Sequence, residues 1–373
     1  AELAAHNVMA AALTALRGFT PPELEETLSR ALALAEQLGD SPAVTRSLLG
    51  LVSLHLVRGN VRRARNLAER AMQLAGDDTG LLPSSHKVLG GVDVTEGQLE
   101  SAARHFEMSI TLYAEHRHRR VLFGDDVGVF CLSWGAHGLW LQGRVEEARE
   151  YVGQAAAIAE ELGNPFTRMQ AGAYRAVSRQ LEGDLDAAWD TAEWTVAGCE
   201  RHNIAYYHEW GVIVGGWVQA QRGEPEAGLE RIRRGLDALQ RQDAVLRMPY
   251  YLSLLAEVQL QLRRPEAARA ALDVAQSVAG QNNDLWYLPE VFRLRAQAEP
   301  AQAEVSLHRA LTLARQFGAR SLELRAATDL AQQLMPSRSA EAAALLEPVV
   351  TTFAPSVVTP DLERARALLN ILT

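Results

Sequence analysis

The chain has 373 residues, of which 48% are hydrophobic and 22% charged, and its formal net charge is −9. This composition excludes a disordered chain and disfavours a general nucleic-acid binder, and no apolar run is long enough to span a bilayer. Ala, Leu, Arg and Glu dominate, and aromatic residues make up only 6%, which together indicate a helical protein.

The predicted helices begin with a pair around residues 2–38, and a repeated unit then sets the pattern. The unit is a glycine, four residues, an alanine, and a second small or apolar residue further on. In chain order it reads GNVRRARNLAERA from Gly59, GQLESAARHFEMS from Gly97, GRVEEAREYVGQA from Gly143 and GDLDAAWDTAEWT from Gly183. A looser copy starts at Gly223, RRPEAARAALDVA has Arg263 in the turn position, and degraded copies follow at 303–310 and 342–346.

The repeated residues have a physical reason. Glycine ends the first helix of a pair by taking the left-handed conformation, and alanines such as Ala148 and Ala188 let helix axes approach closely. One helix pair cannot cover its own apolar face, so successive pairs stack into a solenoid. The sequences EQLGDSP, EELGNP and RQFGARS are therefore predicted to end second helices at Gly39, Gly163 and Gly318.

The segment LGGVDVTEGQLESAARHF at 89–106 resembles a tetratricopeptide repeat. Nearly the whole chain resembles the C-terminal repeat region of large bacterial signal-transduction ATPases, in segments such as GFTPPELEETLSRALALAEQLGD, DDVGVFCLSWGAHGLWLQGRVEEA and TPDLERARALLNIL. In that family an adenylate-cyclase-like or winged-helix domain comes first, an ATPase module second, and the repeats last, similar to the sensor domain of maltose-type transcription activators. The chain has no ATPase or cyclase segment, so these activities are not assigned to it. If the chain is a fragment, the resemblance implies an N-terminal ATPase or cyclase-like module in its parent chain as a partner.

We therefore expect an all-α, right-handed α-solenoid of about nine antiparallel, tetratricopeptide-like helix pairs with a C-terminal capping helix. The chain, 1–373, would form one superhelical domain. Its N-terminal repeats would cover 1–127 with a rim insertion at 115–127, its central repeats 128–280, and its degenerate C-terminal repeats and cap 281–373.

No pattern in the sequence predicts catalysis, a cofactor or a metal ion. Lys87 is the only lysine and follows no glycine-rich loop, so a nucleotide-binding P-loop is absent. His116 and His118 lie among arginines, which would repel a metal cation, while Cys131 and Cys199 fall in helical patterns typical of buried thiols. We expect a cytoplasmic protein without catalytic residues or metal ligands.

Candidate binding residues come from the resemblance to tetratricopeptide repeats, whose first helices line a concave groove. Counting back from each turn glycine, positions 2, 5 and 9 of the first helix point into the groove. We expect at least one of Trp210 and Trp217 to be exposed there, the alternative being that both fill gaps between helices. The residues predicted in this way are Lys87, Ser133, His137, Gln170, Trp210, Trp217, Tyr250, Ser253 and Glu257.

The leading functional hypothesis is a non-catalytic sensor or interaction domain that binds a peptide, a partner protein or a small-molecule effector in the groove. It would contact neither nucleic acid nor membrane directly. One alternative is an assembly scaffold that self-associates, for example as a homodimer. A remote alternative is an enzyme with acid–base chemistry in the groove. A groove ligand would stabilise the sensor against heat, whereas a scaffold would show no such effect.

Overall fold

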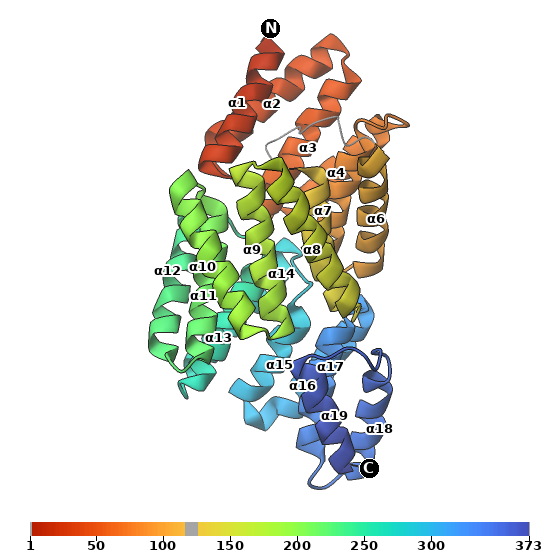
Figure 1. Ribbon diagram of the computed structural model, residues 1–373, viewed down its shortest axis with the longest axis vertical. Coiled ribbons are helices and arrows are strands. Elements are labelled where there is room, and N and C mark those ends of the chain that lie inside the picture. The colour runs from red at the N-terminus through yellow and green to blue at the C-terminus, as the bar shows by residue number, and fades with distance from the viewer. Residues whose placement is uncertain (1, 116–125, 373) are drawn as a thin grey trace.

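The structure, a computed structural model, describes residues 2–115 and 126–372, so the rim insertion predicted at 115–127 lies almost wholly outside the described residues. Within these ranges the chain forms nineteen α-helices, a short 3-10 helix at Pro300–Gln302, and no strand (Figure 1). None of the described helices is both long and apolar enough to cross a membrane. The prediction of nine helix pairs and a terminal helix is confirmed.

The helices pair in chain order, and α19 (Pro360–Leu372) follows the last pair. The pairs are α1 (Glu2–Arg17) with α2 (Pro22–Leu38), α3 (Ser41–Val57) with α4 (Val61–Ala75), α5 (Leu82–Thr95) with α6 (Leu99–Glu115), α7 (Val127–Leu141) with α8 (Val145–Leu162), α9 (Pro165–Glu182) with α10 (Leu185–His202), α11 (Ala205–Gln221) with α12 (Pro225–Arg241), α13 (Met248–Gln261) with α14 (Pro265–Asn282), α15 (Leu288–Ala298) with α16 (Ala303–Phe317), and α17 (Arg320–Leu334) with α18 (Ser339–Val350).

The turns inside the pairs lie where the repeat predicts them. Arg263, in the turn between α13 and α14, has a φ of 58°, and five turn glycines have φ between 76° and 96°. This left-handed conformation is open to glycine at no steric cost. The five glycines are Gly59, Gly97, Gly143, Gly183 and Gly223. Left-handed glycines also end α2, α8 and α16, as predicted, at Gly39, Gly163 and Gly318.

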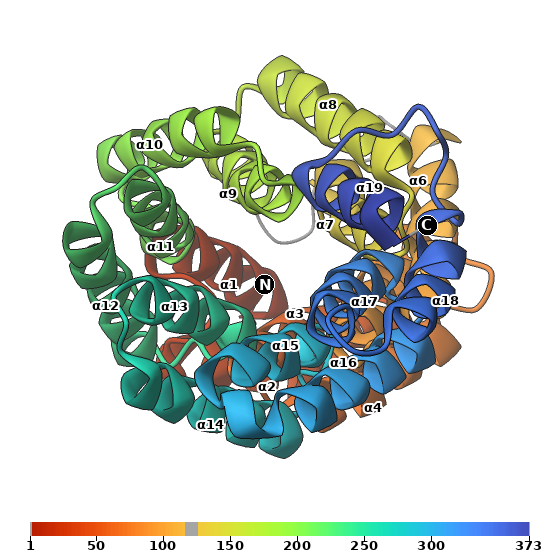
Figure 2. The ribbon, with the colours of Figure 1, turned by 90° about the horizontal axis from the view of Figure 1, so that it is seen from below.

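The first helices of the central pairs are buried on nearly all sides, whereas the second helices bury one stripe. Almost every residue of α7 is buried, but α8 buries only Val145, Ala148, Val152, Ala155 and Ala159. Viewed along the superhelix axis, α8, α10, α12 and α14 form the outside of a ring, with α7, α9, α11 and α13 on its inner side (Figure 2). The side chains of the first helices therefore fill the inside of the ring.

The superhelix makes more than one turn, and its successive turns are hydrogen-bonded to each other along a seam. The carbonyl of Val57, at the end of α3, accepts the N–H groups of residues 245–246, just before α13, at 2.8 and 3.0 Å. The carbonyl of Thr95, at the end of α5, accepts those of residues 285–286, before α15, at 2.7 and 3.3 Å. We call this line of contacts between turns the seam.

Side chains continue the seam beyond α5. Ser321 of α17 donates to the carbonyl of Trp140 at the end of α7, 181 residues away in sequence. Arg325 Nη2 donates to the carbonyl of Leu181 in α9 at 2.8 Å. The first helices α3, α5, α7 and α9 thus each have a carbonyl near their C-terminal end that accepts a hydrogen bond. The donors lie four or five helix pairs further along the chain.

The turn glycines of α3, α5, α7 and α9 also lie in the seam. A Cβ at Gly97 would lie 2.9 Å from the ring of Phe317, and one at Gly59 would lie 2.6 Å from the side chain of Asn282. By contrast, nothing lies within 4 Å of a Cβ at Gly223. Glycine at the turns after α3, α5, α7 and α9 therefore allows both the left-handed conformation and the close approach of the next superhelical turn.

The substitutions Gly97→Ala and Gly223→Ala separate these two requirements. Both place a side chain at positive φ, which costs roughly 1–2 kcal/mol. Only Gly97→Ala adds an atom to the seam, and we expect a further loss of about 1–3 kcal/mol in the free energy of unfolding. Guanidinium unfolding of the two variants measures the difference, and equal losses would contradict the seam contact.

Candidate functional site

The predicted groove residues lie on the inner side of the first helices, and the inside is closed. Trp210 is 1% exposed and Trp217 is 7% exposed, so the expectation that one of them is open to solvent is wrong. Side chains from segments far apart in the sequence meet inside the ring, since Arg247, just before α13, lies against Trp134 and His137 of α7. The residues that are buried are Lys87, Ser133, His137, Gln170, Trp210, Trp217, Tyr250 and Ser253, and Glu257 is partly buried. Their role in binding stays a prediction.

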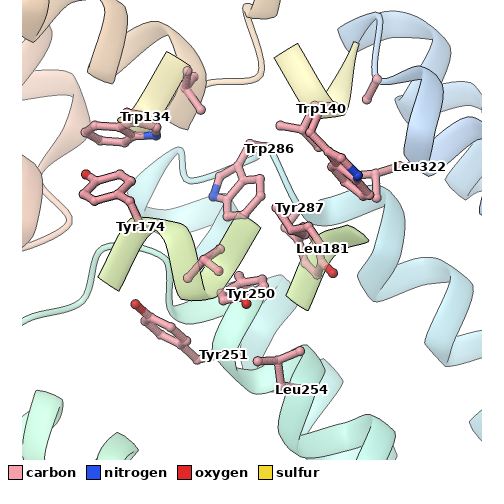
Figure 3. Packing of buried hydrophobic residues seen from close by; sticks show 14 of the residues in the cluster. Trp134, Trp140, Tyr174, Leu181, Tyr250, Tyr251, Leu254, Trp286, Tyr287 and Leu322 are labelled. Carbon is pink, nitrogen blue, oxygen red and sulfur yellow. The ribbon is translucent and has the colours of Figure 1, made fainter. Parts of the chain in front are cut away.

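We call the inside of the ring the lumen, and define it by His137, Tyr174, Trp210, Arg247 and Tyr250. Within it, His137 Nε2 lies 2.9 Å from the carbonyl oxygen of Tyr174, and the Tyr174 and Trp210 rings are 5.0 Å apart. Figure 3 shows the labelled aromatic side chains of the lumen facing one another from several helices. Two further predicted residues are bonded here, because Gln170 donates to Tyr207 Oη at 2.9 Å and Tyr250 donates to Gln180 at 2.8 Å.

The other predicted residues make separate contacts. Trp217 Nε1 donates to Glu257 at 2.9 Å, and Ser253 donates to a carbonyl of its own helix at 2.8 Å. The Nζ atom of Lys87 lies 4.9 Å from the centre of the Phe130 ring. The structure therefore brings only part of the predicted set into one cluster.

Arg247, which the sequence analysis missed, is central to the lumen. It precedes α13, has a φ of 67°, and is 1% exposed. Its guanidinium carbon lies 4.8–5.4 Å from the ring centres of four aromatic residues, which are Trp134, Tyr174, Trp210 and Trp286. Its backbone N–H donates to Asp284 at 2.7 Å, and its Nη1 lies 3.3 Å from His137 Nδ1.

Burial controls the charge of the groups around Arg247. Burial, followed by the nearby charge of Arg247, lowers the pKa of His137 well below its usual range, so the imidazole is neutral at pH 7. Burial also raises the pKa of Asp284 to about 7, although the backbone N–H and the charge of Arg247 oppose the rise. The lumen therefore holds a permanent cation, a neutral imidazole and a carboxyl that is partly protonated near neutral pH.

The raised pKa of Asp284 predicts a pH-dependent stability. In the unfolded chain this carboxyl ionises near pH 4, and in the folded chain near pH 7, so its effect on stability is most favourable below pH 4 and is lost as pH rises to about 7. We expect the free energy of unfolding of the wild type to fall more between pH 5 and pH 8 than that of Asp284→Asn. Guanidinium unfolding at the two pH values measures this, and parallel changes would contradict the assignment.

A second buried cluster is ionic and lies where α15, α17 and α19 meet. Arg293 forms ion pairs with Glu290 and Asp329, both at 2.7 Å. Arg325 pairs with Asp361 at 2.6 Å and with Glu290 at 3.4 Å. Burial alone would lower the pKa of Arg325, but the charges of Asp361 and Glu290 raise it. Every member has an oppositely charged partner, so this cluster joins helices and is not a candidate site.

An outer pocket of about 540 Å³ lies between α8, α9 and α10. Its lining includes small residues of α8 and α9, and the Trp194 side chain, which is 45% exposed. Arg168 pairs with Glu160 at 2.8 Å beside it. Among the described residues that line the pocket, the buried polar atom without a hydrogen bond is Arg168 Nε, and it is ion-paired with Glu160, so the lining does not identify a ligand.

Neither cysteine resembles a nucleophile. Cys131 is buried and its Sγ donates to Ser109 Oγ at 3.2 Å, and burial raises the pKa of the Cys199 thiol to about 12. Across residues 2–115 and 126–372, no three His, Cys, Asp or Glu side chains gather as a metal site. The histidines of the HRHRR segment, His116 and His118, lie outside the described residues.

Comparison with known sequences gives one distant relative. No family model matches the chain. An uncharacterised protein of Rhizobium meliloti (strain 1021) is 24% identical over 209 residues, which are 54% of this chain and 20% of that protein. The match thus spans about a fifth of the length of this relative.

Comparison with solved structures places the fold among tetratricopeptide-like repeat proteins. A Rap protein in complex with Competence and Sporulation Factor has a TM-score of 0.70 at 12% identity, over 100% of this chain and 99% of that one. NprR in complex with its cognate peptide NprX has a TM-score of 0.65 at 12% identity, over 94% and 98% of the two chains. Identities this low show a common fold only.

Proposed function

We propose that this chain is a non-catalytic sensor domain that binds a peptide, or an extended segment of a partner protein, in its lumen. The observation that carries the proposal is the chemistry of the lumen, where aromatic rings surround polar atoms that have no hydrogen-bond partner in residues 2–115 and 126–372. These atoms include Ser133 Oγ, Gln170 Oε1, Tyr251 Oη, Trp134 Nε1 and Trp210 Nε1. A scaffold has no need of such groups, since buried polar atoms without partners destabilise a fold.

Two comparisons support the proposal without deciding it. The Rap protein and NprR, whose folds are similar, were each solved with a bound factor or peptide. The Rhizobium meliloti relative is about five times longer than its matched segment, which suits a sensor that belongs to a larger chain. The resemblance to signalling ATPases suggests that the rest of such a chain is an ATPase or cyclase-like module in the cytoplasm.

The closed lumen implies how the sensor works. No ligand reaches Trp210 or Arg247 while they are at most 1% exposed, so binding requires the seam to open. A ligand that binds the open form more tightly than the closed form shifts the population of molecules towards the open form. The size of the shift depends on the difference between its affinities for the two forms. The seam bonds at residues 245–246 and 285–286 are the contacts that must break.

A reversible crosslink across the seam tests this proposal. Gln98 and Gln316 are exposed and line one cleft at the seam, while both native cysteines are buried. We expect the chain to retain members of a degenerate hexapeptide library, and Gln98→Cys/Gln316→Cys to lose them when joined by a short cleavable crosslinker. Cleavage should restore binding, and Gln98→Cys alone, treated with the same reagent, should bind normally. Retention of peptides by the crosslinked protein would contradict lumen binding.

Self-association is the second candidate function, and one surface favours it. Helix α1 exposes Val8, Met9 and Leu16 at helical spacing, with Val8 71% and Leu16 66% exposed. An exposed apolar stripe of this kind promotes association with another surface. If a second copy covers this stripe, Val8→Glu should shift the sedimentation of the chain from dimer to monomer, and an unchanged monomer would remove the candidate.

A further inference from the structure

The unpartnered atoms of the Arg247 side chain and of the two indoles beside it are hydrogen-bond donors, and the unpartnered oxygen of the neighbouring Asp284, Oδ1, is bonded to none of them. Among the residues that the structure describes, Arg247 Nε and Nη2 have no hydrogen-bond partner, and neither do Trp134 Nε1 and Trp210 Nε1, whose ring centres lie within 4.9 Å of the guanidinium carbon. Guanidinium and indole N–H groups can only donate. The site therefore offers four N–H groups that no acceptor among the described residues, Asp284 Oδ1 included, bonds.

The charge of Arg247 is also unbalanced. The buried guanidinium groups of Arg293 and Arg325 each pair with two carboxylates. Among the described residues no carboxylate is hydrogen-bonded to the side chain of Arg247. Asp284 accepts the backbone N–H of Arg247, and burial raises the pKa of this carboxyl to about 7, so it balances the charge of Arg247 only in part near neutral pH. Aromatic faces attract a cation but do not neutralise it. A buried cation without a paired anion is costly, so an anion that enters the site would relieve a real energetic deficit.

The two guanidinium nitrogens of Arg247 that lack partners indicate which kind of anion would fit the site. Nη1 of Arg247 faces the neutral His137, which leaves Nε and Nη2 without partners. These two nitrogens form one edge of the planar guanidinium, the edge that binds both oxygens of a carboxylate side by side. The indole N–H groups of Trp134 and Trp210 then serve the remaining lone pairs, and the surrounding rings suit an apolar group attached to the carboxylate.

We propose that Arg247 is the anchor for a carboxylate of the lumen ligand, either the carboxyl end of a peptide or an acidic side chain. This inference rests on the proposed function, because it assigns the chemistry of the same site. In the closed form no carboxylate of the described residues is hydrogen-bonded to the guanidinium of Arg247, and in the bound, open form the ligand carboxylate pairs with it. Pairing therefore contributes to the difference in affinity between the two forms that the sensor requires.

Phenylacetate is a suitable probe, with phenylacetamide as its neutral counterpart of the same shape. On the full chain, we expect phenylacetate to raise the unfolding temperature as its concentration c increases, following ln(1 + c/Kd), and phenylacetamide to bind at least about tenfold more weakly. Trp134→Phe and Trp210→Phe keep a ring but remove the N–H, and each should weaken phenylacetate binding several-fold. Trp194→Phe, on the outer surface, should bind it as the wild type does.

Arg247→Gln should abolish phenylacetate binding. If circular dichroism shows that Arg247→Gln does not fold, Arg247→Lys replaces it, since lysine keeps the charge but loses the two-pronged edge, and about tenfold weaker binding is expected. The inference is overturned if the amide binds as well as the acid, if the wild type binds neither, or if binding is unchanged in the folded Arg247 variant and in both tryptophan variants.

Experiments with peptides distinguish a carboxyl end from an acidic side chain as the source of the carboxylate. They also distinguish failure of this inference from failure of the proposed function. Hexapeptide libraries with a free or an amidated carboxyl end, with and without Asp and Glu, are compared on the full chain. Loss of retention with amidation supports a chain end, and loss without Asp and Glu supports an acidic side chain. Equal retention of amidated peptides without acids overturns the inference but leaves the proposed function standing. Phenylacetate binding without retention of any peptide supports the inference and removes the proposed function.

Discussion

Arg325→Met is expected to lower the free energy of unfolding by roughly 3–5 kcal/mol, because it breaks a buried ion pair and leaves carboxylates without their cation. Arg325 links α17 to Asp361 of α19 and to Glu290 of α15. Across the seam it also donates to the carbonyl of Leu181, and its guanidinium lies 5.1 Å from the centre of the Trp140 ring. One side chain therefore ties together helices from two superhelical turns.

Arg338→Met is the matched control. Arg338 pairs with Glu304 at 2.6 Å, but both side chains are about 40% exposed, and exposed pairs of this kind contribute little. We expect its urea unfolding midpoint to equal that of the wild type within error. If Arg325→Met is no less stable than Arg338→Met, the ionic cluster does not hold the superhelical turns together.

Trp210→Ala is expected to cost about 3–5 kcal/mol of stability, as removal of a buried tryptophan leaves a large cavity. The Trp210 ring contacts Tyr174 of α9 at 5.0 Å and Tyr251 of α13 at 6.2 Å between centres, and the cation of Arg247 at 4.8 Å. Its loss removes contacts with three segments of the lumen at once. Guanidinium unfolding followed by circular dichroism measures the effect.

Trp194→Ala provides the comparison, because the same side chain is removed from an exposed position. Trp194 lies on the outer surface of α10 and is 45% exposed, so we expect a change within about 1 kcal/mol. Similar losses in the two variants would show that the lumen is not packed as described. Trp210→Ala is expected to lower stability, so it is unsuited to binding experiments. Trp210→Phe keeps an aromatic ring and removes the indole N–H.

The helix pairs were predictable because their signals are local. A left-handed residue such as Gly97 is required within its own turn, and the spacing of alanines is set by one helix meeting its neighbour. The ends of second helices at Gly39, Gly163 and Gly318 follow from the same conformation. No contact distant in sequence is needed to place these elements.

The closed lumen was not predicted, although one signal was present. The sequence of α7, VGVFCLSWGAHGLWL, is apolar on all sides, and a helix of this kind is buried all round. Its inner face therefore cannot line an open groove. The seam gave no comparable signal, because Gly97 and Gly223 look alike in sequence and differ only in what the next superhelical turn brings near them.

Arg247 was missed for a different reason. Counting back from turn glycines finds residues within first helices, and Arg247 lies just before α13. The available signal was a single charged residue in an otherwise apolar run, VLRMPYY, which is unusual unless the charge has a partner or a function. The four aromatic residues that surround it come from four different segments, and only the folded superhelix brings them together.

The central claim is that the superhelix is closed at rest and opens to admit its ligand. Its most direct test is the distance between spin labels at Gln98→Cys and Gln316→Cys, which lie at one cleft of the seam. The account predicts one short distance for the free protein and a longer one when a retained hexapeptide is added to saturation. A distance that stays short at saturation, or a free protein that already shows the longer distance, would contradict it.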